Sequence, residues 1–158
     1  MFFEHKALYR RIKEDLPEGD YTEPIGKAAV AREGEHLSII TYGAMVHAAC
    51  VAADTLEKEG ISIEVVDLRT LPPLDEETIL ASERKTSKAI VVHEDTLTGG
   101  LGGEIAARIT ERAFESLDGP VLRIAAPDTP VPFSPPLEDA FLPNSAGIVE
   151  KARWLYRY

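Results

Sequence analysis

The stretch ISIEVVDLRTLPPLDEETILASERKTSKAIVVHED, residues 61–95, decides the fold. Residues 61–68 form an apolar run without strict alternation, which predicts a strand that is covered on both faces. Two prolines then break the chain, and Asp75 is a good N-cap for a helix that runs to about Lys85. A second apolar run over residues 88–95 predicts the next strand. This order is a β-α-β unit, whose two strands are expected to be parallel.

The same alternation continues on both sides of this unit. Helices are predicted over residues 45–59 and 102–117, a strand over 120–128, and a last helix from the N-cap Asn144 to the C-terminus. Short strands over 27–32 and 39–42 flank a tight turn, so we expect them to pair as an antiparallel hairpin. The sequence therefore predicts an α/β fold with a mostly parallel sheet and helices on both faces.

Composition limits the function. The chain has 158 residues, 44% of them apolar, and a net charge of −10. This charge disfavours nucleic acid and anionic membrane surfaces, which attract clustered Lys and Arg, and it suits a basic protein partner. No apolar run reaches the ~18–20 residues of a membrane span and no signal peptide is recognised, so a cytoplasmic protein is expected. The single cysteine, Cys50, excludes an internal disulfide and lies in an apolar helical pattern typical of an inert core thiol.

The run VVHEDTLTGGLGGEIAARI, residues 91–109, has the order of a phosphate site: strand, charged tip, glycine turn, helix. Its local chemistry argues against phosphate. Ile105 stands where the dinucleotide fingerprint needs a small residue, Glu104 would compete for the first-turn amides, and the Walker lysine is missing. We expect these glycines to allow left-handed angles and close packing against another surface instead.

The polar tip of this run is the cluster His93, Glu94 and Asp95, at the carboxyl end of a strand, where open α/β sheets place ligands. A histidine beside carboxylates can act in acid–base catalysis, but no partner nucleophile is identifiable. We therefore favour a hydrogen-bonded loop or an interface contact and assign no catalytic residue. Nor do the histidines and Cys50 have the spacing of a metal site. The proline-rich loop after residue 126 offers Phe133 and Phe141 either as interface anchors or as covers of the sheet edge.

Four motifs carry a resemblance to a known family: ITYG (40–43), DLRTLPPLD (67–75), HEDTLTGGLGGEIA (93–106) and PDTPVPFSPPLEDAFLP (127–143). In this order they resemble the C-terminal, transketolase-like domain of the beta subunit of thiamine-diphosphate-dependent 2-oxo-acid dehydrogenases, of either the pyruvate or the branched-chain (2-oxoisovalerate) type. The likeness runs from Gly26 to the end. It implies a three-layer α/β/α domain whose five-stranded mixed sheet has one antiparallel strand.

The resemblance also implies a role in assembly. The domain would pair with a second copy, contact the alpha subunit or the preceding domains, and dock the basic subunit-binding domain of the dihydrolipoyl acyltransferase. Thiamine diphosphate and magnesium belong to the complete parent enzyme. Their binding motif is absent here, so this fragment alone is expected to hold no cofactor and to be inactive. The expected contact residues are His93, Glu94, Asp95, Gly99, Gly100 and Gly102, and the expected docking residues are Glu115, Asp118 and Tyr158.

Two points stay open. Residues 1–16 look like the end of a preceding pyrimidine-binding domain and 17–26 like a linker, which leaves 27–158 as the transketolase-like domain. The alternative function is a free-standing α/β domain that binds a nucleotide or small ligand at the strand tips near His93 and Gly99.

Overall fold

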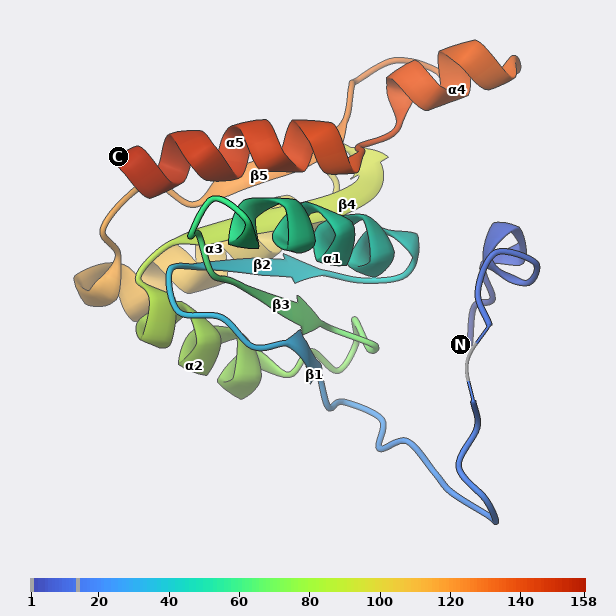
Figure 1. The fold of residues 1–158 in the computed structure, drawn as a ribbon, viewed down its shortest axis with the longest axis horizontal. Coiled ribbons are helices and arrows are strands. Elements are labelled where there is room, and N and C mark those ends of the chain that lie inside the picture. The colour runs from blue at the N-terminus through green and yellow to red at the C-terminus, as the bar shows by residue number, and fades with distance from the viewer. Residues whose placement is uncertain (1, 14) are drawn as a thin grey trace.

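The computed structural model of the chain describes residues 2–13 and 15–158, and at its centre is a five-stranded sheet (Figure 1). The strands lie in the spatial order β1-β3-β2-β4-β5, and β1 runs antiparallel to the other four. Their bounds are β1 (Ala29–Arg32), β2 (Leu37–Thr41), β3 (Ile63–Asp67), β4 (Ala89–Thr96) and β5 (Leu122–Ala126). The predicted mixed sheet with one antiparallel strand is confirmed.

Helices cover both faces of the sheet, as predicted. The sheet residues alternate between two cores: Ile39 of β2 packs with α1 and α5, whereas Ile40 packs with α2 and α3. Figure 1 shows the resulting three layers, with α5 on one side of the sheet and α2 on the other. The helices are α1 (Ala44–Glu57), α2 (Glu76–Thr86), α3 (Leu101–Ala113), α4 (Pro135–Phe141) and α5 (Ser145–Arg157), with short 3-10 turns η1 (Lys6–Leu8) and η2 (Phe114–Ser116).

The two expected N-caps are confirmed. The Asp75 carboxylate accepts a hydrogen bond from the Thr78 N–H at 3.4 Å, and the Asn144 side chain accepts one from the Gly147 N–H at 2.9 Å. These bonds satisfy amides that have no partner inside the helix. They explain why α2 and α5 begin where the sequence indicated.

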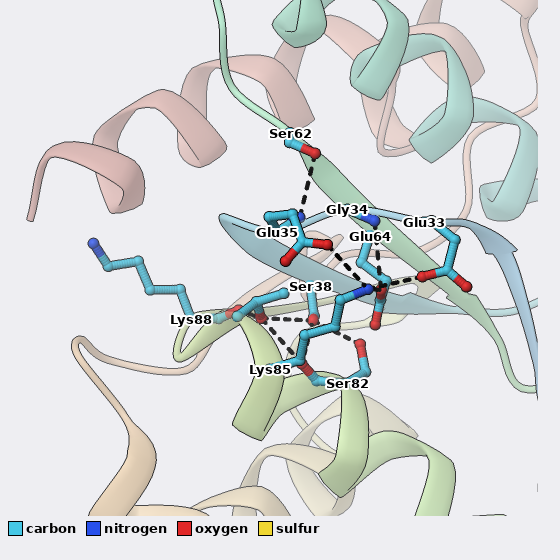
Figure 2. A network of polar contacts seen from close by, with 10 residues as sticks. Glu33, Gly34, Glu35, Ser38, Ser62, Glu64, Ser82, Lys85 and Lys88 are labelled. Atoms are coloured by element: carbon cyan, nitrogen blue, oxygen red, sulfur yellow. Dashed lines mark hydrogen bonds and ion pairs between the residues drawn. The ribbon is translucent and has the colours of Figure 1, made fainter.

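The predicted hairpin of the first two strands is wrong. β1 pairs with β3, and β3 also lies beside β2, so β1 and β2 are not neighbours. The connection between them crosses the amino end of β3 (Figure 2), where the His36 N–H donates to the Ser62 carbonyl at 2.9 Å. Gly34 makes this crossing possible, because a Cβ there would lie inside the backbone of Ile63 and Glu64.

A charged network fastens this crossing to α2 (Figure 2). Lys85 donates to Glu64 at 2.5 Å and to Glu33 at 2.8 Å, and its ammonium lies 3.6 Å from Glu35. The Glu64 side chain is only 3% exposed, so Lys85 neutralises a carboxylate that would otherwise be buried without a counter-charge. One lysine therefore ties the connection, β3 and α2 together.

The proline-rich loop contains a helix that the sequence did not reveal. Pro135 and Pro136 open α4, where missing N–H groups cost nothing because first-turn amides have no helical partner. Toward the N-terminus, residues 2–13 and 15–25 are almost all exposed, and Figure 1 shows them as a long loop that leaves the body at β1 and turns back beside it. Met1 and Glu14, within the expected remnant 1–16, lie outside the described residues. None of the described helices is long and apolar enough to cross a membrane.

Candidate interface site at the carboxyl ends of the strands

The expected contact residues gather where β4 ends and α3 begins. His93 is the fifth residue of β4, Glu94 and Asp95 follow it, and the chain then turns through Gly99, whose φ is +78°. Gly100 is the N-cap of α3, and it has no side chain to bond the first-turn amides. The structure therefore brings all six expected contact residues into one strand–turn–helix corner.

His93 is the centre of this corner and is completely buried. A Cβ on Gly100 would lie 2.6 Å from its Cε1 atom, and a Cβ on Gly102 would approach its Nε2 atom more closely still. Real side-chain carbons keep at least about 3.0 Å from such neighbours. Gly102 is thus needed because the first turn of α3 lies directly on the imidazole of the same chain, whereas a side chain on Gly100 would meet both the imidazole and the Thr96 carbonyl.

Burial also decides the charge of His93. Removal from water lowers its pKa, an effect that the Asp95 carboxylate opposes, so the folded ring is neutral near pH 7. Neither ring nitrogen has a hydrogen-bond partner among the described residues. The Tyr42 ring stacks parallel to the imidazole, with centroids 6.5 Å apart and 4° between the planes. Burial, and then Asp95 and Glu94, raise the pKa of Tyr42, which keeps its hydroxyl protonated.

The glycine turn is held to the neighbouring edge strand by residues that sequence reasoning missed. Asp128, just after β5, accepts hydrogen bonds from the Thr98 N–H at 2.8 Å and from the Thr98 hydroxyl at 2.6 Å. These bonds lower the pKa of Asp128. Arg123 of β5 donates to the Leu97 carbonyl at 2.9 Å. The pairing of two distant loops left no signal in the sequence, because it depends on β5 lying next to β4.

Glu94 and Asp95 remain accessible at the rim of the corner. Glu94 is half-buried, and one of its oxygens lies 3.1 Å from the His5 Nε2 atom of the N-terminal segment. Asp95 is exposed. The N-terminal segment meets the same end of the sheet again through Arg69, which pairs with Glu23 of the expected linker. A buried histidine cannot reach a substrate, whereas the accessible carboxylates above it can contact another protein surface. The arrangement therefore suits an interface better than proton transfer to a substrate.

The corner does not fit a diphosphate. In phosphate-binding turns the glycines let the backbone approach the ligand, but here Gly100 and Gly102 face His93. Glu104 places a carboxylate in the first turn of α3, where it pairs with Arg108 at 2.7 Å. Residues 2–13 and 15–158 also contain no group of three or more His, Cys, Asp or Glu side chains placed to hold a metal ion.

The expected docking residues lie at the opposite, amino end of the parallel strands. Glu115 is in η2, and the Asp118 N–H donates to the Ser87 carbonyl at 2.8 Å. Gly119 packs beside Tyr158, because a Cβ on it would lie 3.3 Å from that ring. The turn after α3 and the C-terminus therefore form one surface, on which Glu115, Asp118 and Tyr158 are all exposed.

Beside this surface, the outer side of α5 and the start of β5 border an open groove of about 710 Å³. Arg123, Lys151, Arg153 and Arg157 line it together with Trp154 and Tyr158. A basic groove is unusual on a chain with a net charge of −10. It follows the second half of α5, and its Arg123 is shared with the corner, because that side chain donates to the Leu97 carbonyl.

The sheet order, the single antiparallel edge strand and the helices on both faces define an α/β domain of the transketolase C-terminal type. The family model of the transketolase C-terminal domain matches residues 26–148, and the chain belongs to this family. The Bacillus subtilis pyruvate dehydrogenase E1 component subunit beta is 55% identical over 153 residues, which cover 97% of this chain and 47% of that protein.

Two further relatives agree. The 2-oxoisovalerate dehydrogenase subunit beta of the same organism is 50% identical over 145 residues, 91% of this chain and 44% of its own length. The solved structure of a split-gene transketolase, an inactive beta4 tetramer, superposes with a TM-score of 0.76 at 28% identity, over 92% of this chain and 46% of that one. The chain thus spans about half the length of the curated relatives it matches, and these homologues are beta subunits of 2-oxo-acid dehydrogenases.

Proposed function

We propose that this chain is the assembly domain of a 2-oxo-acid dehydrogenase beta subunit. It pairs with a second copy, supports the domains that hold the active site, and docks the dihydrolipoyl acyltransferase of the complex. The observation that carries the proposal is the likeness of nearly the whole chain, at 55% identity, to one half of a pyruvate dehydrogenase E1 beta subunit.

The corner around His93 serves this role as a contact surface. Its glycine turn is fixed from inside by the buried imidazole, and its rim offers the Glu94 and Asp95 carboxylates and Gly99. Such a rim suits the alpha subunit or the preceding domains of the parent enzyme. A rigid turn loses little conformational entropy when a partner covers it, which favours association.

The cofactors of the parent, thiamine diphosphate and magnesium, are then held by parts of the enzyme that this chain does not carry. This chain alone does not decarboxylate a 2-oxo acid. Calorimetry of the chain with thiamine diphosphate and Mg²⁺ is expected to show no heat of binding. Tight binding would contradict the proposal and would favour a ligand site at the strand tips.

The docking surface is tested with the isolated subunit-binding domain of a dihydrolipoyl acyltransferase, using surface plasmon resonance. We expect the chain to bind it, and Glu115→Lys with Asp118→Lys to weaken binding by at least about tenfold, because opposite charges across an interface become like charges. The matched control is Glu18→Lys with Asp20→Lys, which makes the same change in net charge in the exposed linker. Equal weakening by both pairs would exclude Glu115 and Asp118 as a specific docking surface.

A further inference from the structure

Residues 127–144, between β5 and α5, form an arm that projects past the N-terminal end of α5 (Figure 1). Its helix α4 has seven residues, all of them described, of which six are exposed and none is buried. A helix this short is not stable alone in water, since isolated helices shorter than about 12–15 residues are marginal. The arm therefore needs a surface to pack against, because in its own chain only Phe141 of α4 is half-buried and no residue of the helix is buried.

The chemistry of the arm is apolar and acidic. Phe133 is fully exposed, and Val131 and Leu137 are more than half exposed. All of its charged side chains are carboxylates: Asp128, Glu138 and Asp139. Asp128 is engaged by Thr98, so Glu138 and Asp139 are the charges available to a partner. A surface that binds this arm must combine aromatic or aliphatic area with positive charge.

The groove along α5 has this combination. Four of its residues are cations, whereas Glu150 is its one carboxylate. Arg153 pairs with Glu59, and Arg123 donates to a backbone carbonyl. Lys151 and Arg157 form no ion pair with the described residues, so both side chains are available to pair with carboxylates of a partner.

Aromatic area lies between these cations. Trp154 and Tyr158 are 51% and 68% exposed, and their rings form a tilted pair with centroids 5.4 Å apart. A tilted aromatic pair at the surface can accept a third ring such as that of Phe133, a favourable arrangement that places edges against faces. The groove is thus complementary to the arm in both charge and apolar character.

The two features lie at opposite ends of α5. The arm leads directly into Ser145 at the start of the helix, whereas the groove follows the second half of the helix, from Glu150 to Tyr158. In Figure 1 the arm of a chain points away from the C-terminal end of its own α5. Two copies with antiparallel α5 helices would bring the arm of each to the groove of the other. A two-fold axis makes both contacts identical and closes the assembly as a dimer.

We propose that the arm, residues 127–144, docks in the α5 groove of a second copy of this chain, and that this exchange holds the dimer together. Phe133 packs against the exposed side of the Trp154–Tyr158 pair, while Glu138 and Asp139 face Lys151 and Arg157. This inference rests on the self-association in the proposed function and names the surfaces that perform it.

Charge reversal on one side at a time tests the exchange. The arm variant carries Glu138→Lys and Asp139→Lys, and the groove variant carries Lys151→Glu and Arg157→Glu. Each is expected to weaken its own dimerisation by at least about tenfold in sedimentation equilibrium. An equimolar mixture of the two should dimerise again, because the basic arm then meets the acidic groove and the unchanged arm meets the unchanged groove. The control with Glu18→Lys and Asp20→Lys should dimerise normally, and circular dichroism should show that all variants are folded.

The outcomes separate this inference from the proposed function. If the unchanged chain dimerises and both variants still dimerise as well as it does, the exchange is wrong while self-association stands. If the unchanged chain is a monomer at every concentration tested, the exchange and self-association both fail. Loss of dimers by each variant with no recovery in the mixture also overturns the exchange.

Photo-cross-linking gives a second test that does not depend on the charge-reversed variants being folded. The photoreactive analogue benzoylphenylalanine replaces Phe133, and the chain is mixed with isotope-labelled unchanged chain before irradiation. Mass spectrometry is expected to find cross-links from position 133 to residues 150–158 of the labelled copy. Cross-links elsewhere, or none between copies, would overturn the exchange. The surface that covers the arm would then lie in the part of a beta subunit that this chain does not span.

Discussion

His93 shows how one residue can dictate the sequence around it. Gly102 is small because the imidazole fills the space beneath the first turn of α3, and Gly100 because the imidazole and the Thr96 carbonyl both crowd it. Gly103 faces Arg123 at an ordinary distance instead. The sequence indicated that these glycines serve close packing. It did not indicate that the packed surface is a side chain of the same segment, since contact between a strand residue and the next helix depends on how the turn folds back.

Gly102→Ala is expected to destabilise the chain by about 1–3 kcal/mol, because the new methyl group overlaps the buried imidazole and forces a backbone shift. Urea denaturation measures the loss. Gly103→Ala is the control in the same turn: its Cβ would meet only Arg123 at 3.4 Å, so stability should be unchanged or slightly raised. An equal loss in both variants would show that the helix turn, rather than His93, requires glycine.

The buried imidazole should also make stability depend on pH. In the unfolded chain His93 takes up a proton near its usual pKa of about 6.5, whereas burial lowers its pKa in the folded chain. Its contribution is therefore fully present above about pH 6.5 and is lost as the pH falls below that value. Between about pH 7 and pH 5.5 the unchanged chain should lose up to about 1 kcal/mol more than His93→Gln.

Urea denaturation of the unchanged chain and of His93→Gln at about pH 7 and at about pH 5.5 measures this difference. If His93→Gln keeps the full dependence, the imidazole is protonated equally in the folded and unfolded states, and its burial does not set its charge.

At the scale of elements, the strand pairing was the feature hardest to predict. A short loop between two strands usually makes a hairpin, and the expectation failed because Gly34 lets the connection cross the amino end of β3. The Lys85 network that holds this crossing joins the lysine to Glu64 and Glu33, which lie 21 and 52 positions before it in the sequence, so no local pattern marks it. The caps of α2 and α5, in contrast, are local, and the sequence located them correctly.

Lys85→Met is expected to destabilise the chain by about 2 kcal/mol, because Glu64 is left buried without its counter-charge. Thermal and urea unfolding measure this loss. Lys88→Met is the matched control, since Lys88 is near the same helix end and donates only to the exposed Tyr156 carbonyl at 3.3 Å. Adding Glu64→Gln to Lys85→Met should restore part of the stability; no recovery would mean that Lys85 acts through packing alone.

At the scale of the whole molecule, the N-terminal segment stands apart from the body. Residues 2–13 and 15–25 are exposed apart from half-buried Leu8 and Ile12, and their contacts with the sheet end are the pairs His5–Glu94 and Glu23–Arg69. Exposed ion pairs contribute at most about 1 kcal/mol each. The division at residues 16 and 26 therefore stays a prediction that truncation can test.

Removal of residues 1–16 should change the thermal midpoint by less than about 4 °C, since the core of the domain is untouched. Removal of residues 145–158 should abolish cooperative unfolding, because α5 supplies Ile148, Ala152 and Leu155 to one of the two cores. Calorimetry of both truncated chains distinguishes the two results. A large loss from the first truncation would place the N-terminal segment within the folded unit.

The sequence by itself determined the elements of this protein and their class. Apolar runs without alternation marked β3 and β4 as strands covered on both faces, and caps such as Asp75 and Asn144 marked helix starts, because these signals act over only a few residues. Four motifs in a fixed order indicated the family. Only the tertiary structure decided that β1 pairs with β3, that His93 lies beneath its own glycine turn, and that α4 projects opposite a basic groove. The first depends on residues far apart in the chain, which meet only when the sheet order places them together. The second depends on how the turn after β4 folds back, and the third on how α4 and α5 are placed in space.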